Sequence, residues 1–120
     1  MANVAILGAS EKPERYAHQA QQMLAAAGHR VFPVARSTNP ILGVTPVAKL
    51  EEIAEPIDTV TVYIGPAHLE GVMAGLLAKA PRRVIFNPGT ESEPHEARLR
   101  EAGIDCQRAC TLVLLSTGQY

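Results

Sequence analysis

The chain has 120 residues, of which 47% are hydrophobic and 19% charged, and its formal net charge is −1. This size and balance predict one globular domain spanning residues 1–120. A net charge near zero argues against nucleic acid or an anionic membrane as a partner. No apolar run approaches the roughly 18 residues of a membrane span, and the N-terminus lacks the layout of a signal peptide. We therefore expect a soluble, cytoplasmic protein.

Strand-like apolar runs alternate with helical patterns along the chain. Strands are predicted at residues 3–7, 30–34, 58–64, 82–86 and 104–106, with a short one near Val44. This alternation is typical of βαβ units. It predicts an α/β fold, a doubly wound (Rossmann-like) parallel sheet of five to six strands with helices on both faces. Pro33 would cost a ladder hydrogen bond in a central strand, so the 30–34 strand is expected near an edge.

Helices are predicted between these strands. Apolar residues at 17, 20, 24 and 27 form a helical stripe that Gly28 ends, and a helical turn follows at 48–53. The clearest amphipathic pattern follows Gly65 and Pro66 and continues to Leu77. A short helix from about Glu93 to Ala102 carries an acidic run, which we interpret as a solvated helix face.

The first predicted strand ends in a turn that favours an anion. Gly8 stands directly before a helix, where Rossmann-like folds place phosphates. The dinucleotide fingerprint G-x-G-x-x-G is incomplete, because Ser10 and Pro13 occupy its second and third glycine positions. Ser10 offers a hydroxyl, and the following residues Lys12, Arg15 and Tyr16 offer two charges, an aromatic edge and a second hydroxyl. The alternative interpretation is an ordinary strand-to-helix turn with a solvated basic surface.

The end of the second strand discriminates among ligands. NAD-binding domains normally place Asp or Glu there for the ribose hydroxyls, whereas this chain has Ala35 and Arg36. A basic residue at this position favours a phosphate near the adenosine ribose, as in NADP or coenzyme A. A solvent-facing loop arginine remains the alternative.

Together these stretches resemble a known family. The segments are VAILGAS-EKPERY, GHRVFPV, ILGVTPVAKLEEI, DTVTVYI, IFNPGT and AGIDCQRACTLVLL, which span about Asn3 to Gly118. In their order and spacing they resemble the small single-domain CoA-binding proteins, whose fold is similar to the CoA-binding domain of succinyl-CoA synthetase.

The resemblance implies that coenzyme A or an acyl-CoA lies across the carboxyl ends of the strands. It places Gly8, Ala9, Ser10, Lys12 and Arg15 at the diphosphate. Ala35 and Arg36 lie toward the adenosine and its 3′-phosphate. Tyr63, Ile64, Gly65 and Pro66 form the facing wall, and Asn87, Pro88 and Gly89 follow the pantetheine arm.

Catalytic and metal sites are not predicted. Cys106 and Cys110 are expected to be free thiols, with no histidine adjoining either one in sequence. The four histidines lack metal-ligand spacing, although His68 falls near the predicted cleft. The sequence thus favours non-catalytic binding of coenzyme A.

Two other functions remain open. One is an NADP-linked oxidoreductase in which Arg36 holds the 2′-phosphate. The other is a regulatory partner subunit that uses the apolar segment 111–115 as an interface. A homodimer is a further candidate, because small domains often cover apolar surface with a second copy.

Overall fold

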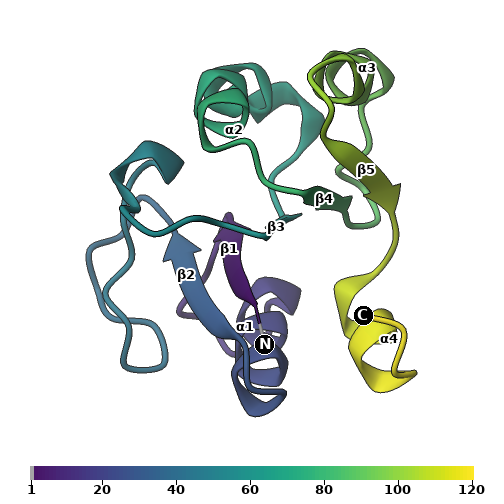
Figure 1. The fold of residues 1–120 in the computed structure, drawn as a ribbon. Helices are drawn as coiled ribbons and strands as arrows, with labels where there is room; N and C mark the ends of the chain where they lie inside the picture. The colour runs from purple at the N-terminus through teal and green to yellow at the C-terminus, as the bar shows by residue number, and fades with distance from the viewer. Residues whose placement is uncertain (1) are drawn as a thin grey trace.

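A computed structural model describes residues 2–120 and contains one five-stranded parallel sheet (Figure 1). Its strands are β1 Asn3–Leu7, β2 Arg30–Val34, β3 Thr59–Val62, β4 Arg83–Phe86 and β5 Asp105–Arg108. Their order across the sheet is β2-β1-β3-β4-β5. The predicted doubly wound α/β fold is confirmed, with five strands. β2 is an edge strand, as expected from Pro33, and within residues 2–120 no helix is long and apolar enough to cross a membrane.

Helices cover both faces of the sheet (Figure 1). One layer consists of α1 Tyr16–Ala26 and α4 Thr111–Ser116, and the other of the 3₁₀ turn η1 Leu50–Glu52, α2 Met73–Lys79 and α3 Glu93–Glu101. Successive residues of a strand point to opposite faces. Ala5 and Leu7 accordingly pack in the larger core cluster under α2 and α3, whereas Val4 and Ile6 pack against α1.

Two predicted elements differ in detail. The segment that follows Gly65 begins as two 3₁₀ turns, η2 Pro66–His68 and η3 Glu70–Val72, and becomes α-helical only at Met73. Gly71 lies in the second turn, and glycine weakens an α-helix. Near Val44, in place of a third strand, there are isolated bridges from Ile41 to Val44 and from Val34 to Val47.

A buried amide joins the centre of the sheet to α4. Asn87, which is 3% exposed, directly follows β4. Its Nδ2 donates to Thr61 Oγ1 (2.7 Å) and to the Val62 carbonyl (2.8 Å), and its Oδ1 accepts from the Thr111 N–H (2.8 Å). The first N–H groups of a helix lack acceptors within the helix. Asn87 therefore provides an acceptor for α4 while it cross-links β3 and β4.

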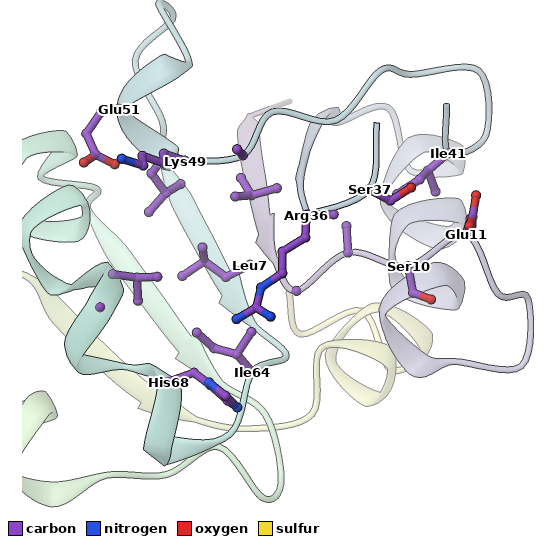
Figure 2. Close-up of a pocket in the computed structure, with 18 of the residues that line it drawn as sticks. Leu7, Ser10, Glu11, Arg36, Ser37, Ile41, Lys49, Glu51, Ile64 and His68 are labelled. Atoms are coloured by element: carbon purple, nitrogen blue, oxygen red, sulfur yellow. The ribbon is translucent and has the colours of Figure 1, made fainter. Parts of the chain in front are cut away.

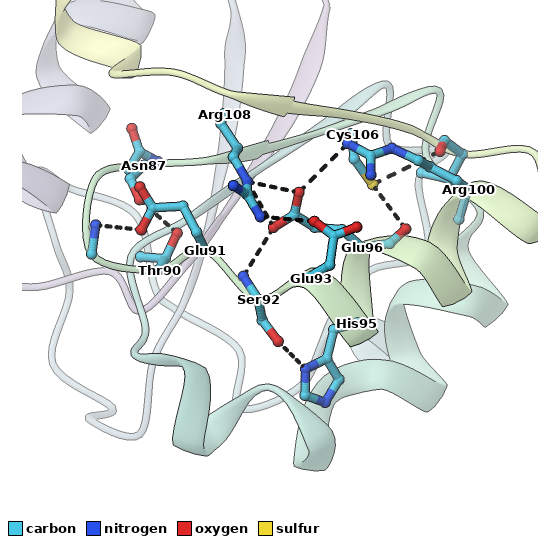
Figure 3. A network of polar contacts seen from close by, with 12 residues as sticks. Asn87, Thr90, Glu91, Ser92, Glu93, His95, Glu96, Arg100, Cys106 and Arg108 are labelled. Carbon is cyan, nitrogen blue, oxygen red and sulfur yellow. Dashed lines mark hydrogen bonds and ion pairs between the residues drawn. The ribbon is translucent and has the colours of Figure 1, made fainter.

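The acidic helix α3 is only partly solvated. Glu93 and Glu101 are exposed, but Glu96 is fully buried. Figure 3 shows its carboxylate between Arg108 and the start of α3. The Glu96 carboxylate accepts from Arg108 Nε at 3.0 Å and from the Ser92 N–H at 2.9 Å. The expectation of a purely solvated acidic face was wrong for Glu96, because this charge is paired with a cation of β5.

Both the backbone angle and the surrounding space favour glycine at position 8. Its φ is +86°, in the left-handed region that L side chains rarely adopt. A Cβ there would lie 2.8 Å from Ile64 Cγ2 and 2.9 Å from the Tyr63 carbonyl oxygen. The N–H groups of Gly8 and Ala9 both donate to the Val34 carbonyl at 3.1 Å. The first turn is thus fixed against the ends of both neighbouring strands.

We expect Gly8→Ala to destabilise the protein more than Gly28→Ala does. Gly28 has a similar φ of +90°, but a Cβ at this position would have no neighbouring atom within 4 Å. Its substitution should therefore cost only the left-handed backbone strain, about 1–2 kcal/mol. Gly8→Ala adds overpacking against Tyr63 and Ile64, directly after β3, typically about 1–3 kcal/mol more. Urea unfolding of the three proteins measures the difference, and equal losses would contradict the close approach.

Candidate functional site

A cleft of ≈ 940 Å³ opens at the carboxyl ends of β1, β2 and β3 (Figure 2). This is where the strand order reverses, and doubly wound sheets bind ligands at that switch point. The volume falls within the roughly 300–1,000 Å³ of small-molecule sites. The lining comes from the first turn, the loop after β2, η1 and the two 3₁₀ turns: Leu7, Gly8, Ala9, Ser10, Glu11, Lys12, Val34, Ala35, Arg36, Ser37, Ile41, Ala48, Lys49, Leu50, Glu51, Ile64, Ala67, His68, Gly71 and Val72.

The first turn presents backbone amides to a ligand. The N–H groups of Gly8 and Ala9 are already bonded to Val34, and the Lys12 N–H donates to Ser10 Oγ at 3.1 Å. Within residues 2–120, the N–H groups of Ser10 and Glu11 have no acceptor. Consecutive free amides in a turn suit an anion. These two residues lie two and three positions after Gly8. The glycine therefore shapes the turn, and Ser10 and Glu11 offer the N–H donors.

Three basic side chains line the cleft, namely Lys12, Arg36 and Lys49. None of them forms an ion pair within the part of the chain that the structure describes. Arg36 extends over the cleft toward Ile64 and His68 (Figure 2). The acidic lining residues are Glu11 and Glu51. The three cations outnumber these two carboxylates, which favours an anionic ligand.

The structure brings seven of the predicted contacts together in the cleft: Gly8, Ala9, Ser10, Lys12, Ala35, Arg36 and Ile64. Eight others do not line it: Arg15, Tyr16, Tyr63, Gly65, Pro66, Asn87, Pro88 and Gly89. The first turn is long, and α1 begins only at Tyr16, so Arg15 and Tyr16 lie beyond the lining. Tyr63 packs with Val4 and Ile6 on the opposite face of the sheet.

Sequence reasoning missed most of the opposite wall. Lys49, Glu51, Ala67 and Val72 line the cleft although the sequence analysis did not place them there. Ile64 of the predicted facing wall does line it, because Ile64 faces opposite to Tyr63 and therefore toward the larger core. His68 does line the cleft, as its place near the predicted cleft suggested.

Burial holds the Tyr63 phenol and the Cys106 thiol in their neutral forms. Burial raises the pKa of Tyr63 to about 12, even though the Thr111 and Thr61 hydroxyls act in the opposite direction. Burial also raises the pKa of the Cys106 thiol to about 11. Cys110 is half-buried, and neither cysteine lines the cleft. Among residues 2–120, no three His, Cys, Asp or Glu side chains are grouped to hold a metal ion.

The sequence and the fold of this chain recur in known proteins. The chain is 31% identical to the uncharacterized protein YneT of Bacillus subtilis (strain 168) over 100 residues, which cover 83% of this chain and 74% of YneT. A crystal structure of an uncharacterized protein superposes with a TM-score of 0.95 at 42% identity, covering 100% of this chain and 98% of the other.

A larger protein contains the same fold. The dinucleotide-forming acetyl-coenzyme A synthetase 1 of Ca. Korarchaeum cryptofilum, in complex with phosphate and ADP, superposes with a TM-score of 0.75 at 17% identity. The match covers 90% of this chain but 25% of that protein, so it shows a shared fold. The family described as CoA binding domain matches residues 2–116, which is nearly the whole chain. This protein therefore belongs to the CoA-binding domain family.

Proposed function

We propose that the protein binds coenzyme A or an acyl-CoA in the cleft at the carboxyl ends of β1, β2 and β3, without catalysing a reaction itself. One observation carries the proposal most directly: Arg36, without an ion-pair partner within residues 2–120, extends over a cleft of ≈ 940 Å³. A phosphorylated adenosine ribose needs a cation at the end of the second strand. The family to which the chain belongs supports the same ligand.

The proposal assigns each part of the ligand to a part of the lining. Ser10 and Lys12 bind the diphosphate, together with the free amides of the first turn. Arg36 binds the 3′-phosphate with Ala35 beside the adenosine. Ile64 and Val72 provide the apolar wall beyond. The eight predicted contacts that lie outside the lining, and the cytoplasmic location, remain predictions from the sequence.

Because Arg36 could also bind the phosphate of NADP, NADP remains the second candidate ligand. NADP carries its phosphate on the 2′-oxygen, close to where coenzyme A carries the 3′-phosphate. An NADP-linked oxidoreductase would use Arg36 in the same way. The loss of the second and third fingerprint glycines argues against it, because close backbone approach to a pyrophosphate depends on them.

We expect Arg36→Ala to weaken binding of coenzyme A but not of dephospho-CoA, which lacks the 3′-phosphate. A charge-assisted hydrogen bond contributes about 1.5–3 kcal/mol, so the dissociation constant for coenzyme A should rise about tenfold or more. Lys12→Ala should weaken both ligands, because both carry the diphosphate. Isothermal titration calorimetry with each ligand and each variant measures this.

Arg82→Ala is the matched control. Arg82 pairs with Asp58 at 3.0 Å, immediately before β4 and outside the cleft, so its removal should leave both affinities unchanged. Equal losses for the two ligands in Arg36→Ala would contradict the assignment of Arg36. If the wild-type protein bound NADPH but not coenzyme A, NADP would take the place of coenzyme A as the proposed ligand.

The two cysteines should differ sharply in reactivity. The thiolate is the nucleophile, and burial raises the pKa of Cys106 to about 11, so this thiol stays protonated at neutral pH. We expect Ellman's reagent to modify one thiol of the native protein quickly, and the second only after unfolding. Cys110→Ser should abolish the fast reaction and Cys106→Ser should preserve it. A fast phase that survives in Cys110→Ser would show that Cys106 is accessible and ionised.

A further inference from the structure

The helical layer formed by α1 and α4 carries no Asp, Glu, Lys or Arg side chain. We define the neutral layer as residues 16–29 and 109–120, which include both helices and the chain that follows each. Neither segment contains Asp, Glu, Lys or Arg, although these residues make up 19% of the whole chain. The two segments are far apart in sequence but lie together on one face of the sheet (Figure 1).

The opposite layer shows that this neutrality is not general. Its helices carry Glu51, Glu52, Lys79, Glu93, Glu96, Arg98, Arg100 and Glu101. Several of these charges are paired across elements, as Arg98 is with Glu70 at 2.8 Å. An ordinary solvated helix carries such charges on its outer face. The surface of the neutral layer differs from this pattern on both of its helices.

The neutral layer also carries large exposed apolar side chains. Tyr16 at the start of α1 is 69% exposed and Val113 in α4 is 53% exposed, the two highest values among the exposed large hydrophobic side chains of residues 2–120. Neither lines the cleft. Beneath the layer, Arg83 is 7% exposed and its guanidinium lies 4.5 Å from the ring centroid of Tyr120. Because this cation is buried, it adds no charged side chain to the outer surface of the layer.

Depletion of charge with exposed aromatic and aliphatic side chains marks the core of a protein interface. Of the 26 positions in the neutral layer, twenty are exposed or half-buried. This is comparable with the roughly 20–30 residues that each partner contributes to a standard interface. Glu14, Arg15 and Arg30 flank the layer in sequence and would supply the polar rim.

We propose that the neutral layer is the contact surface of a homodimer. In a twofold interface the same patch meets itself, so each charged side chain near the axis would face an identical charge. A surface without charged side chains avoids this repulsion. It also offers no complementary charge to an acidic or basic partner, so a second copy of the chain suits it better. The cleft lies at the strand ends and remains open in each copy.

Light scattering coupled to gel filtration tests this without any ligand. The wild-type protein should elute with twice the monomer mass of 12.8 kDa. Val113→Glu and Gln22→Glu each place a negative charge on an exposed position of the layer, one on α4 and one on α1. Both should shift the protein to the monomer, and thermal unfolding confirms that the variants are folded.

Leu77→Glu is the matched control, because Leu77 is an exposed leucine on α2 of the opposite layer, 37% exposed. This variant should stay dimeric. A wild-type monomer at all concentrations, or dissociation by Leu77→Glu but not by the two layer variants, would overturn the proposal. Failure of coenzyme A binding would leave this result unaffected, since the experiment contains no ligand.

Discussion

The close approach of the first turn to the end of β3 determines where the residues of that turn lie in the cleft. Only a residue without a side chain fits between β1 and Ile64 at this point, and only glycine adopts the required backbone angle without strain. The same constraint holds the turn against β2 through the Val34 carbonyl. Because Gly8 and Ala9 are held in place, the positions of Ser10 and Lys12, which follow them in the chain, are restricted as well. The geometry of the cleft therefore depends on a contact within the sheet.

Polar side chains buried away from the cleft hold the remaining elements in place. The side-chain amide of Asn87 forms hydrogen bonds with β3 and with the start of α4, and the Glu96 carboxylate is paired with Arg108 of β5. A buried amide or carboxylate without partners would be costly, so each of these groups specifies the position of what it contacts. The polar atoms of Asn87, which directly follows β4, are thus already bonded within the protein.

The sequence was informative where local chemistry determines structure. The strands, the order of elements and the edge position of β2 followed from apolar runs, glycine turns and Pro33. Six of the seven cleft residues that it predicted lie directly after β1 or β2, where the position of a residue along the chain decides its place. The wall formed by Lys49, Ala67 and Val72 was not predictable in this way, because it depends on how η1 and the 3₁₀ turns pack across the sheet. The burial of Glu96 was equally hidden, since its partner Arg108 lies on a different element.

The hydrogen bonds of the first turn also bear on the entropy of binding. Gly8 and Ala9 are anchored to Val34, Lys12 to Ser10, and the Ser10 carbonyl to His18 Nδ1 at 3.0 Å, all without a ligand. A loop that is already held in shape loses little conformational freedom when a ligand arrives. The first turn is thus preorganised, and the interaction energy of an anion there is retained as affinity instead of being spent on ordering the chain.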